Sequence, residues 1–563
     1  MILDILNEIL NKAYLDCGYE FKANVLKSNR PDLCDYQSDD LFKLAKLFHK
    51  SPIVIGNEIV DKINSYEDFS KYFKEVTLVN PGFINITISD FLINNLLNEM
   101  INNEDFNIKK DSSELYFLDY GGPNVAKPLH VGHLRTAIIG ESIKRILKYK
   151  GHKVISDVHL GDYGLQIGQV IYGVLNDKKS LDEITLEYLE ETYPKMSKLC
   201  KEDSDILEKC ASITKELQDG NLEYKKIWKK ICEVSVNDIK RIYRYLDVSF
   251  DLYNGESDAY QYIPKLTEIL EEKKLLKNSD NAKIIEVNEE NDLKEYPPLI
   301  YQKSNGAYLY GTTDLAAIYE RVTKYSPQHI LYIVDLRQKL HFEQVFRAIK
   351  KSNITTAELK HLGYGTVNGS DGRPFKTRSG DTLKLDSLFK EVKNTFLNIK
   401  EENKNLKEAD LDIIVNAIIK FADLQNNYEK DYIFDLNKFS NVVGKTGPYI
   451  LYTYLRINKI INKESINISS LNNIIYNEYD RDLRLKLLDL PIIFEMSFNE
   501  RKPNYIAEFI YDVCVLGNIF YQNNHITGLE ESQKQQWLTL LSLTNKILKE
   551  MLNLLAIQIP SEM

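Results

Sequence analysis

Two histidines follow a glycine-rich turn in the run DYGGPNVAKPLHVGHLR at residues 119–135. His130 and His133 are three residues apart, which places both on one face of a helix that starts there. Lys127 precedes them, and Gly132 leaves space for a ligand close to the backbone. Imidazoles and an ammonium beside the free N–H groups of a helix start are suited to nucleotide phosphates. A pair of surface histidines is the alternative, whereas no HExxH or CxxC spacing indicates zinc.

A strand and a helix must position this turn. Residues 116–120 are rich in aromatics, which predicts a short buried strand, and a Gly-Gly-Pro turn ends it at Pro123. From Leu129 onward the apolar spacing becomes helical. Helices alternate with further strands, which are predicted at 153–156, 329–335 and 359–367. Such alternation is typical of a parallel sheet wrapped by helices, which binds ligands at the carboxyl ends of its strands.

The composition is that of a globular protein with several domains. The chain has 563 residues, of which 43% are hydrophobic and 27% charged. Its formal charge of −10 excludes a global basic field, although RNA binding depends on local surfaces and not on the total. The six cysteines lack CxxC spacing, which indicates reduced thiols. No apolar run approaches the ~18 residues of a membrane span, and the acidic N-terminus differs from a signal peptide, so we expect a cytoplasmic protein.

The residues around the histidines carry a resemblance to a known family. The run GGPNVAKPLHVGHLRT at 121–136 resembles the first signature of class I aminoacyl-tRNA synthetases, in the form found in arginyl-tRNA synthetases, where PNxAKP leads into HxGH. The resemblance implies ATP-dependent activation of L-arginine as arginyl-adenylate and its transfer to the 3′ end of tRNA(Arg), with release of pyrophosphate and AMP. It also implies that His130 and His133 bind the phosphate chain and its transition state, while Gly132 lets adenine lie against the helix start.

A second phosphate-binding segment is expected after the last strand. The run GTVNGSDGRPFKTRSG at 365–380 resembles the KMSKS loop of class I synthetases in a degenerate form. The residues that fall on this motif are Phe375, Lys376, Thr377 and Arg378. By resemblance the aromatic and hydroxyl side chains bind ATP, and the two basic ones are catalytic. The second lysine of the motif is missing, and the family implies Lys127 as its substitute. Without the first motif, a glycine-rich hairpin with basic side chains would be preferred.

Acidic residues could select the amino acid, because a guanidinium is planar, always charged and best bound by paired carboxylate contacts. The family match assigns Asp119 and Asp314 to this role. Tyr310 precedes Asp314 by four residues, so both lie on one face if that segment is helical. The match completes the pocket with Asn124 and Gln338. A helix N-cap at Asp314 and a solvated loop amide at Gln338 are the alternatives.

The fold class predicted for the chain is α/β, with three domains. An N-terminal α/β domain is predicted at 1–108, and a Rossmann-type parallel-sheet catalytic domain at 109–404. Long charged helices at about 171–290 indicate an insertion in the catalytic domain. Residues 405–563 have the spacing of an all-α helical bundle. By resemblance, the first domain contacts tRNA and the last binds the anticodon.

The partners implied are tRNA(Arg), L-arginine and ATP with Mg²⁺. The predicted tRNA contacts are Arg30, Asp32, Tyr36 and Gln37 in the first domain and Lys445, Tyr449 and Arg456 in the last. A capping segment without RNA contact, and tyrosines in the core, are the alternatives. We expect a monomer without a structural metal and without a membrane partner. The alternative functions are a paralogue that binds tRNA without aminoacylating it, and another class I synthetase or nucleotidyltransferase.

Overall fold

The computed structural model describes residues 2–304, 306–369, 371–373, 383–464, 470–472, 476–526 and 528–563. The chain forms two compact units, and neither is continuous in the sequence. Unit 1 comprises residues 1–109, 453–496 and 509–550, and unit 2 comprises residues 110–452, 497–508 and 551–563. Outside the described residues lie four predicted ATP-site residues, Phe375, Lys376, Thr377 and Arg378.

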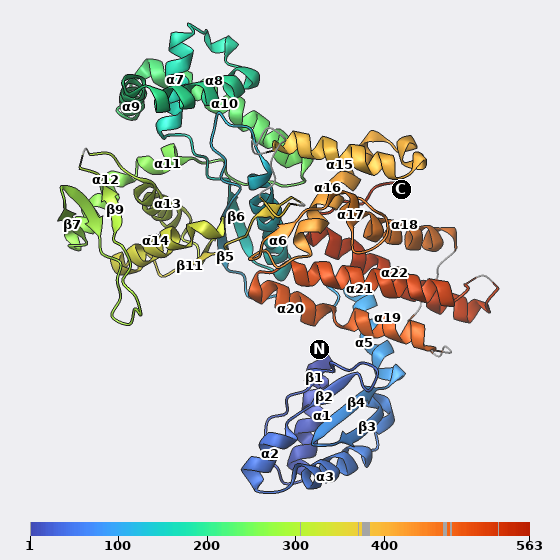
Figure 1. Cartoon of the computed structure of the whole chain (residues 1–563). Coiled ribbons are helices and arrows are strands. Elements are labelled where there is room, and N and C mark those ends of the chain that lie inside the picture. The colour runs from blue at the N-terminus through green and yellow to red at the C-terminus, as the bar shows by residue number, and fades with distance from the viewer. Residues whose placement is uncertain are drawn as a thin grey trace. The chain divides into compact units, whose positions relative to one another are not determined.

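The centre of unit 2 is a parallel sheet with the strand order β11-β10-β5-β6 (Figure 1). In this order the strands span Glu358–His361, His329–Ile333, Leu115–Tyr120 and Lys153–Asp157. The predicted parallel sheet is therefore confirmed. From β5 the chain first adds β6 on one side and later adds β10 and β11 on the other, so the strand order reverses between β5 and β10. In such sheets, ligands bind at the carboxyl ends of the strands beside this reversal.

Helix α6 (Leu134–Lys150) connects β5 to β6 and packs on both strands. It ends at Gly151, whose φ of 109° is a conformation that favours glycine. The helix starts later than the sequence spacing indicates, because residues Val131–His133 form a 3-10 turn, η1, before the α-helix begins. At Gly140 the helix touches β5, where a Cβ atom would overlap the Tyr120 side chain.

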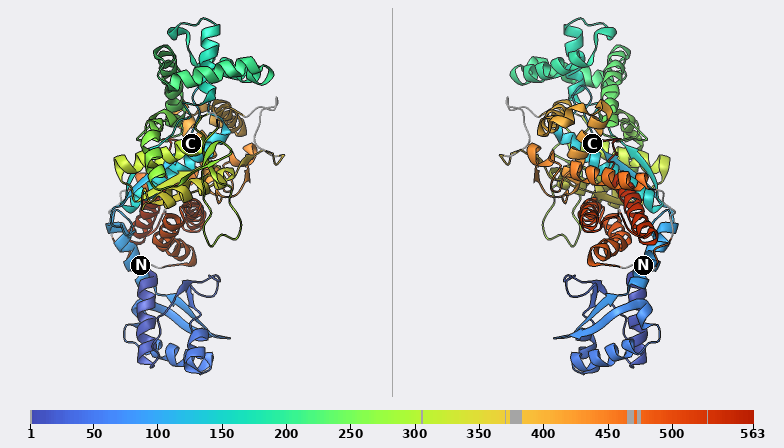
Figure 2. Two further views of the ribbon diagram at one scale, coloured as in Figure 1. Left: turned by 90° about the vertical axis from the view of Figure 1, so that its left-hand side faces the viewer. Right: turned by 90° about the vertical axis from the view of Figure 1, so that its right-hand side faces the viewer.

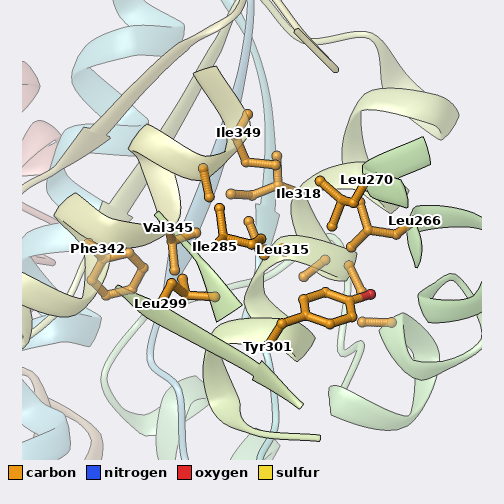
Figure 3. Packing of buried hydrophobic residues seen from close by; sticks show 14 of the residues in the cluster. Leu266, Leu270, Ile285, Leu299, Tyr301, Leu315, Ile318, Phe342, Val345 and Ile349 are labelled. Atoms are coloured by element: carbon orange, nitrogen blue, oxygen red, sulfur yellow. The ribbon is translucent and has the colours of Figure 1, made fainter. Parts of the chain in front are cut away.

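Another group of helices covers the opposite face of the sheet. Successive strand residues point to opposite faces, so Phe117 lies opposite to the face of Tyr120. Phe117 belongs to a buried core with Ile330 and Tyr332 of β10. Figure 3 shows the part of this core that comes from β8, β9, α12, α13 and α14. The helices span Ile263–Glu272, Tyr310–Tyr325 and Lys339–Ser352, and the antiparallel strands β7, β8 and β9 span Leu276–Ser279, Ala282–Ile285 and Leu299–Gln302.

Helices α7 to α10 pack on one another at one end of unit 2, at the top of both views in Figure 2. They span Leu165–Asn176, Leu186–Glu202, Ser204–Gln218 and Leu222–Tyr245, with η2 at Leu181–Glu183 and α11 at Glu256–Tyr260. The remaining elements between residues 336 and 439 are η3 (Leu336–Gln338), β12 (Val367–Asn368), α15 (Leu385–Ile399), η4 (Glu401–Asn405), α16 (Glu408–Leu424), β13 (Tyr432–Ile433) and α17 (Leu436–Phe439).

Residues 551–563 return to unit 2 and close it around α6 and α16. The Ser142 hydroxyl of α6 donates to the Leu554 carbonyl at 2.9 Å. The buried Lys420 ammonium of α16 donates to the Ala556 carbonyl. Burial lowers the pKa of Lys420 to about 7.

Unit 1 contains an antiparallel sheet of the order β1-β2-β4-β3, in which β3 and β4 form a hairpin. The strands β1 to β4 span Leu26–Lys27, Tyr36–Ser38, Phe73–Val79 and Phe83–Ile88. Helices α1 to α5 span Ile2–Asp16, Leu41–Phe48, Pro52–Asn64, Phe69–Tyr72 and Asp90–Asn102. Helices α18 to α22, wholly or partly in this unit, span Gly447–Lys463, Glu478–Leu488, Leu490–Glu500, Asn504–Asn523 and Glu531–Leu554. Among the described helices, none combines the length and the apolar character needed to cross a membrane.

The packing of α6 on β5 predicts that Gly140→Ala lowers the melting temperature by several degrees. The added methyl group must displace the Tyr120 ring, and overpacking of this kind costs about 1–3 kcal/mol. Gly517→Ala on α21 is the matched control, because a Cβ there meets only Ile457 Cδ1 at an ordinary 3.6 Å. Thermal unfolding followed by circular dichroism compares the two variants. Equal melting temperatures would contradict the close contact at Gly140.

Candidate active site

The turn after β5 holds the two predicted histidines against each other. His130 is extended, with φ of −126° and ψ of 172°, and it caps η1 instead of lying on a regular helix face. The Gly132 N–H donates to His130 Nδ1 at 3.0 Å, and the His130 N–H donates to His133 Nδ1 at 3.2 Å. The ring centroids are 4.0 Å apart. Gly132 is required by His130 itself, because a Cβ there would lie 2.8 Å from the imidazole Cε1.

Both imidazoles are neutral hydrogen-bond donors at pH 7. Burial lowers the pKa of His133 to about 3, and the charges of His130 and Lys127 add to the decrease. Burial, followed by the charge of Lys127, also lowers the pKa of His130. Because Nδ1 of each ring accepts a backbone hydrogen bond, the ring proton lies on Nε2. The two Nε2–H groups can therefore donate to phosphate oxygens.

Arg135 and Thr136 in the first turn of α6 anchor the histidine turn beside the reversal of strand order. Thr136 Oγ1 accepts from the Gly121 N–H at 2.8 Å and donates to the Ile333 carbonyl at 2.7 Å, so it joins the ends of β5 and β10. Arg135 is 1% exposed and binds Asp423 Oδ2 of α16 at 2.9 Å. Neither side chain was predicted from the sequence to take part in the site. Their only signal was a position in the first helical turn after HxGH.

Asp119 and Asp157 form the floor of the site at the ends of β5 and β6. They are partners in the strand register, and Arg321 of α13 contacts Oδ2 of Asp119 at 2.6 Å and Oδ2 of Asp157 at 3.3 Å. Burial raises the pKa of Asp119, while the Arg321 charge opposes that shift. Asp119, predicted to bind a substrate guanidinium, thus already contacts a guanidinium of the chain. Arg321 was missed, although it follows Asp314 by seven residues, which is two helical turns.

Tyr310 and Asp314 lie in the first turns of α13, so the helix assumed for them is present. Leu309 is the N-cap of α13, and Asp314 therefore is not. Asp314 Oδ2 lies 2.5 Å from Nε2 of His341 on α14. Gln338 is exposed at the end of η3, immediately before α14. The Asp314 carboxylate thus has an imidazole partner on the next helix.

A third edge of the site forms where three loops run side by side. Asn124 pairs with Gly161 in a parallel bridge, and Leu160 pairs with Gly255 in another. Glu256 follows at the start of α11, and burial raises its pKa to about 7. His159 opposes that increase, whereas Asp162 and Asp314 add to it, so these charged groups surround Glu256. No motif in the sequence indicated Glu256.

The segment that follows the undescribed residues 374–382 returns to the histidine turn. The Val131 N–H donates to the Leu383 carbonyl at 3.0 Å, and the Leu385 N–H donates to the Leu129 carbonyl at 3.0 Å. Lys127 lies on the same turn, and its Nζ is 4.4 Å from the centroid of the Tyr193 ring. The chain a few residues beyond the predicted second phosphate-binding segment is therefore paired with the first.

The predicted tRNA contacts have mixed exposure. Arg30 and Asp32 are exposed and bind each other at 2.7 Å. Tyr36 is 2% exposed in β2, so its side chain belongs to the core, and Gln37 donates to Asn85 at 2.8 Å. In the helical region, Lys445 pairs with Glu508, Tyr449 is half-buried, and Arg456 stacks on Tyr521 at 4.4 Å.

Known proteins resemble the chain over its whole length. Residues 94–436 match the family model described as tRNA synthetases class I (R), catalytic domain. Residues 1–88 match the arginyl tRNA synthetase N terminal domain, and residues 450–563 match the DALR anticodon binding domain. The arginine–tRNA ligase of Alkaliphilus oremlandii is 41% identical over 97% of both chains, and that of Agathobacter rectalis is 40% identical over 100% of both.

Solved structures agree with this match. The arginyl-tRNA synthetase of Plasmodium falciparum is 28% identical, with a TM-score of 0.80 over 100% of this chain and 99% of that one. The arginyl-tRNA synthetase of Thermus thermophilus is 20% identical and shares the fold, with a TM-score of 0.79 over 100% of both chains. The chain belongs to the arginyl-tRNA synthetase family of class I aminoacyl-tRNA synthetases.

Proposed function

We propose that the chain activates L-arginine with ATP as arginyl-adenylate and transfers it to the 3′ end of tRNA(Arg). The observation that carries this proposal is that hydrogen-bond donors suited to phosphates and carboxylates suited to a cation both lie around the ends of β5 and β10. Neutral and cationic donors at His130, His133 and Lys127 suit a polyanion, and carboxylates at Asp119 and Asp314 suit a cation. Such an arrangement favours the reaction of a nucleotide with a cationic amino acid.

In activation, the arginine carboxylate attacks the α-phosphorus of ATP and pyrophosphate leaves. We assign the Nε2–H groups of His130 and His133 to the phosphate chain, Lys127 to the departing pyrophosphate, and Gly132 to adenine. ATP enters as its Mg²⁺ complex, in which phosphates and waters hold most of the ion. The resemblance of residues 365–380 to the KMSKS loop supports ATP binding by Phe375 and Thr377. It supports a catalytic role for Lys376 and Arg378.

The arginine pocket is acidic, which supports a cationic substrate. Among the described residues, Asp157, Asp162 and Glu256 add their carboxylates to those of Asp119 and Asp314, and the Arg321 guanidinium contacts Asp119 and Asp157. We assign Asp314 and Tyr310 to the substrate guanidinium, and Asn124 and Gln338 to its amino and carboxylate end. Asp119 shares its charge with Arg321 and acts from the floor of the pocket. A lysine ammonium cannot fill contacts set for a planar fork, so we expect rejection by about 10⁴-fold.

Transfer requires tRNA contacts outside the active site, and we place them in residues 1–108 and 405–563. The exposed Arg30 and Asp32 remain candidates, as do Gln37 and, in the helical region, Lys445, Tyr449 and Arg456. Tyr36 acts through packing, because it is buried. The monomer expected from the sequence is also our proposal for the working unit.

A paralogue that binds tRNA without aminoacylating it is the second candidate. Its only support is the missing lysine of the second motif. Retention of both histidines and of Lys127 in one turn, with Nδ1 of each ring accepting from the backbone and the ring proton left on Nε2, favours the enzyme.

Arginine-dependent exchange of pyrophosphate into ATP tests the proposed function. We expect exchange with arginine in the presence of tRNA(Arg) and none above background with lysine. The same assay without tRNA shows whether activation requires it. Measurable tRNA binding with no exchange for any amino acid would establish the paralogue instead.

Asp314→Asn is expected to abolish arginine activation while ATP binding stays intact. The substitution keeps the shape of the side chain but removes the charge that faces the guanidinium, so kcat/KM for arginine should fall by at least about 100-fold. Asp205→Asn, exposed in the first turn of α9, is the control for an ordinary change of charge. A near-normal KM for arginine in the Asp314 variant would refute this assignment.

The ionisation of Glu256 predicts a pH dependence of arginine binding. Because burial raises its pKa to about 7, the side chain is neutral below that pH and anionic above it. The anion attracts a guanidinium, so KM for arginine should fall by up to about tenfold between about pH 6 and pH 8. Glu256→Gln should flatten this profile in the exchange assay. If KM for arginine depends on pH in the variant as it does in the wild type, Glu256 is not the origin of that pH dependence.

A further inference from the structure

One face of helix α8 contacts the candidate active site at two points. Glu190 and Tyr193 are three residues apart on this face. The Lys127 ammonium lies over the Tyr193 ring, 4.4 Å from its centroid. Glu190 pairs with Lys384 at 2.7 Å, and the Lys384 backbone forms a bridge with His130. The helix thus touches the turn before the histidines and the segment that returns to them.

An aromatic partner leaves the charge of Lys127 available. Among the described residues, no carboxylate forms an ion pair with Lys127. The face of an aromatic ring attracts an ammonium through its quadrupole but adds no opposite charge. A carboxylate at the same place would neutralise the ammonium and repel phosphates. The ring can therefore hold Lys127 in one place while its full charge still acts on a bound polyanion.

The contact lies at a break in the hydrogen bonding of α8. Pro194 follows Tyr193 inside the helix and has no N–H to donate to the carbonyl of Glu190. The turn that carries both contacts is thus held less firmly by its own backbone than its neighbours are. Tyr193 also lies close to Tyr310: burial, then Glu256, then the Tyr193 phenol raise the pKa of Tyr310. Tyr193 consequently lies between the proposed phosphate and arginine sites.

We propose that Tyr193 is a positioning residue that holds the Lys127 ammonium where the pyrophosphate leaves. The inference rests on the proposed arginine activation. It also gives a role to the helical insertion at about 171–290, for which the sequence indicated none. Its contribution should fall on the rate of adenylate formation and not on ATP binding, because the ring acts through Lys127, which is assigned to the departing pyrophosphate. The aromatic face is the required feature, and the phenol hydroxyl is not.

Single-turnover formation of arginyl-adenylate by the full chain tests this role, with tRNA(Arg) present and arginine saturating. We expect Tyr193→Leu to slow the step by about three- to thirtyfold with little change in KM for ATP. Tyr193→Phe, which keeps the ring, should stay within about twofold of the wild type. Tyr188→Leu is the matched control, because Tyr188 is also a half-buried tyrosine of α8, and its ring faces Lys179 at 5.9 Å instead of the active site.

A double-variant cycle separates positioning from general damage to α8. In a Lys127→Ala background, Tyr193→Leu should cause no further loss, since the group that it positions is gone. A full additional loss in that background would overturn the proposal, as would normal adenylate formation by the Tyr193→Leu single variant. A wild-type chain that fails to activate arginine would refute the proposed function and this inference together, whereas an active wild type with an active Leu variant refutes the inference alone.

Discussion

Two buried aspartates face each other across β5 and β6, and the arrangement of the site depends on how their repulsion is relieved. Like charges directly opposite each other destabilise a sheet, and a buried charge without a partner is costly. Arg321 relieves both by binding Asp119 and Asp157 together. The helix that carries it, α13, must therefore dock at this position, and its docking places Asp314 two turns earlier on the same helix. The need to neutralise two aspartates of the sheet thus also places Asp314 in the acidic pocket.

The reversal of strand order explains why the phosphate-binding groups gather beside that pocket. The turn with the histidines leaves the end of β5, and η3 leaves the region after β10, so both loops open on the same edge. Thr136 keeps the two strand ends together, because its hydroxyl bonds to both. The backbone of residues 383–385 then pairs with the turn from a distant part of the chain. Three separate segments are thereby held within one small region by the Thr136 hydroxyl and by main-chain hydrogen bonds.

Local patterns predicted much of this fold, because the apolar spacing of a strand or helix is set by neighbouring residues. The strand at Leu115–Tyr120 and the parallel sheet followed from such patterns, whereas the helix at Tyr310–Tyr325 was only a condition of the predicted arginine pocket. The capping role of His130 did not, because HxGH spacing fits a regular helix face equally well. Nor did the partner of Asp119, since Arg321 is 202 residues away and the choice of a partner at that range is made by the tertiary fold. Tyr36 was predicted to contact tRNA by resemblance, whereas the structure buries its side chain. Its burial could not be derived from the residue type alone.

The discontinuity of unit 2 has a consequence for its synthesis. Residues 551–563 belong to this unit, so it cannot close while they are still inside the ribosome. Until they emerge, the Lys420 ammonium of α16, fully buried in the finished unit, lacks the Ala556 carbonyl to which it donates. A nascent chain can form the parallel sheet early, but the enclosure around α6 and α16 must wait for translation to reach this segment. The unit that carries the histidine turn therefore gains its complete enclosure only after most of its residues have been made.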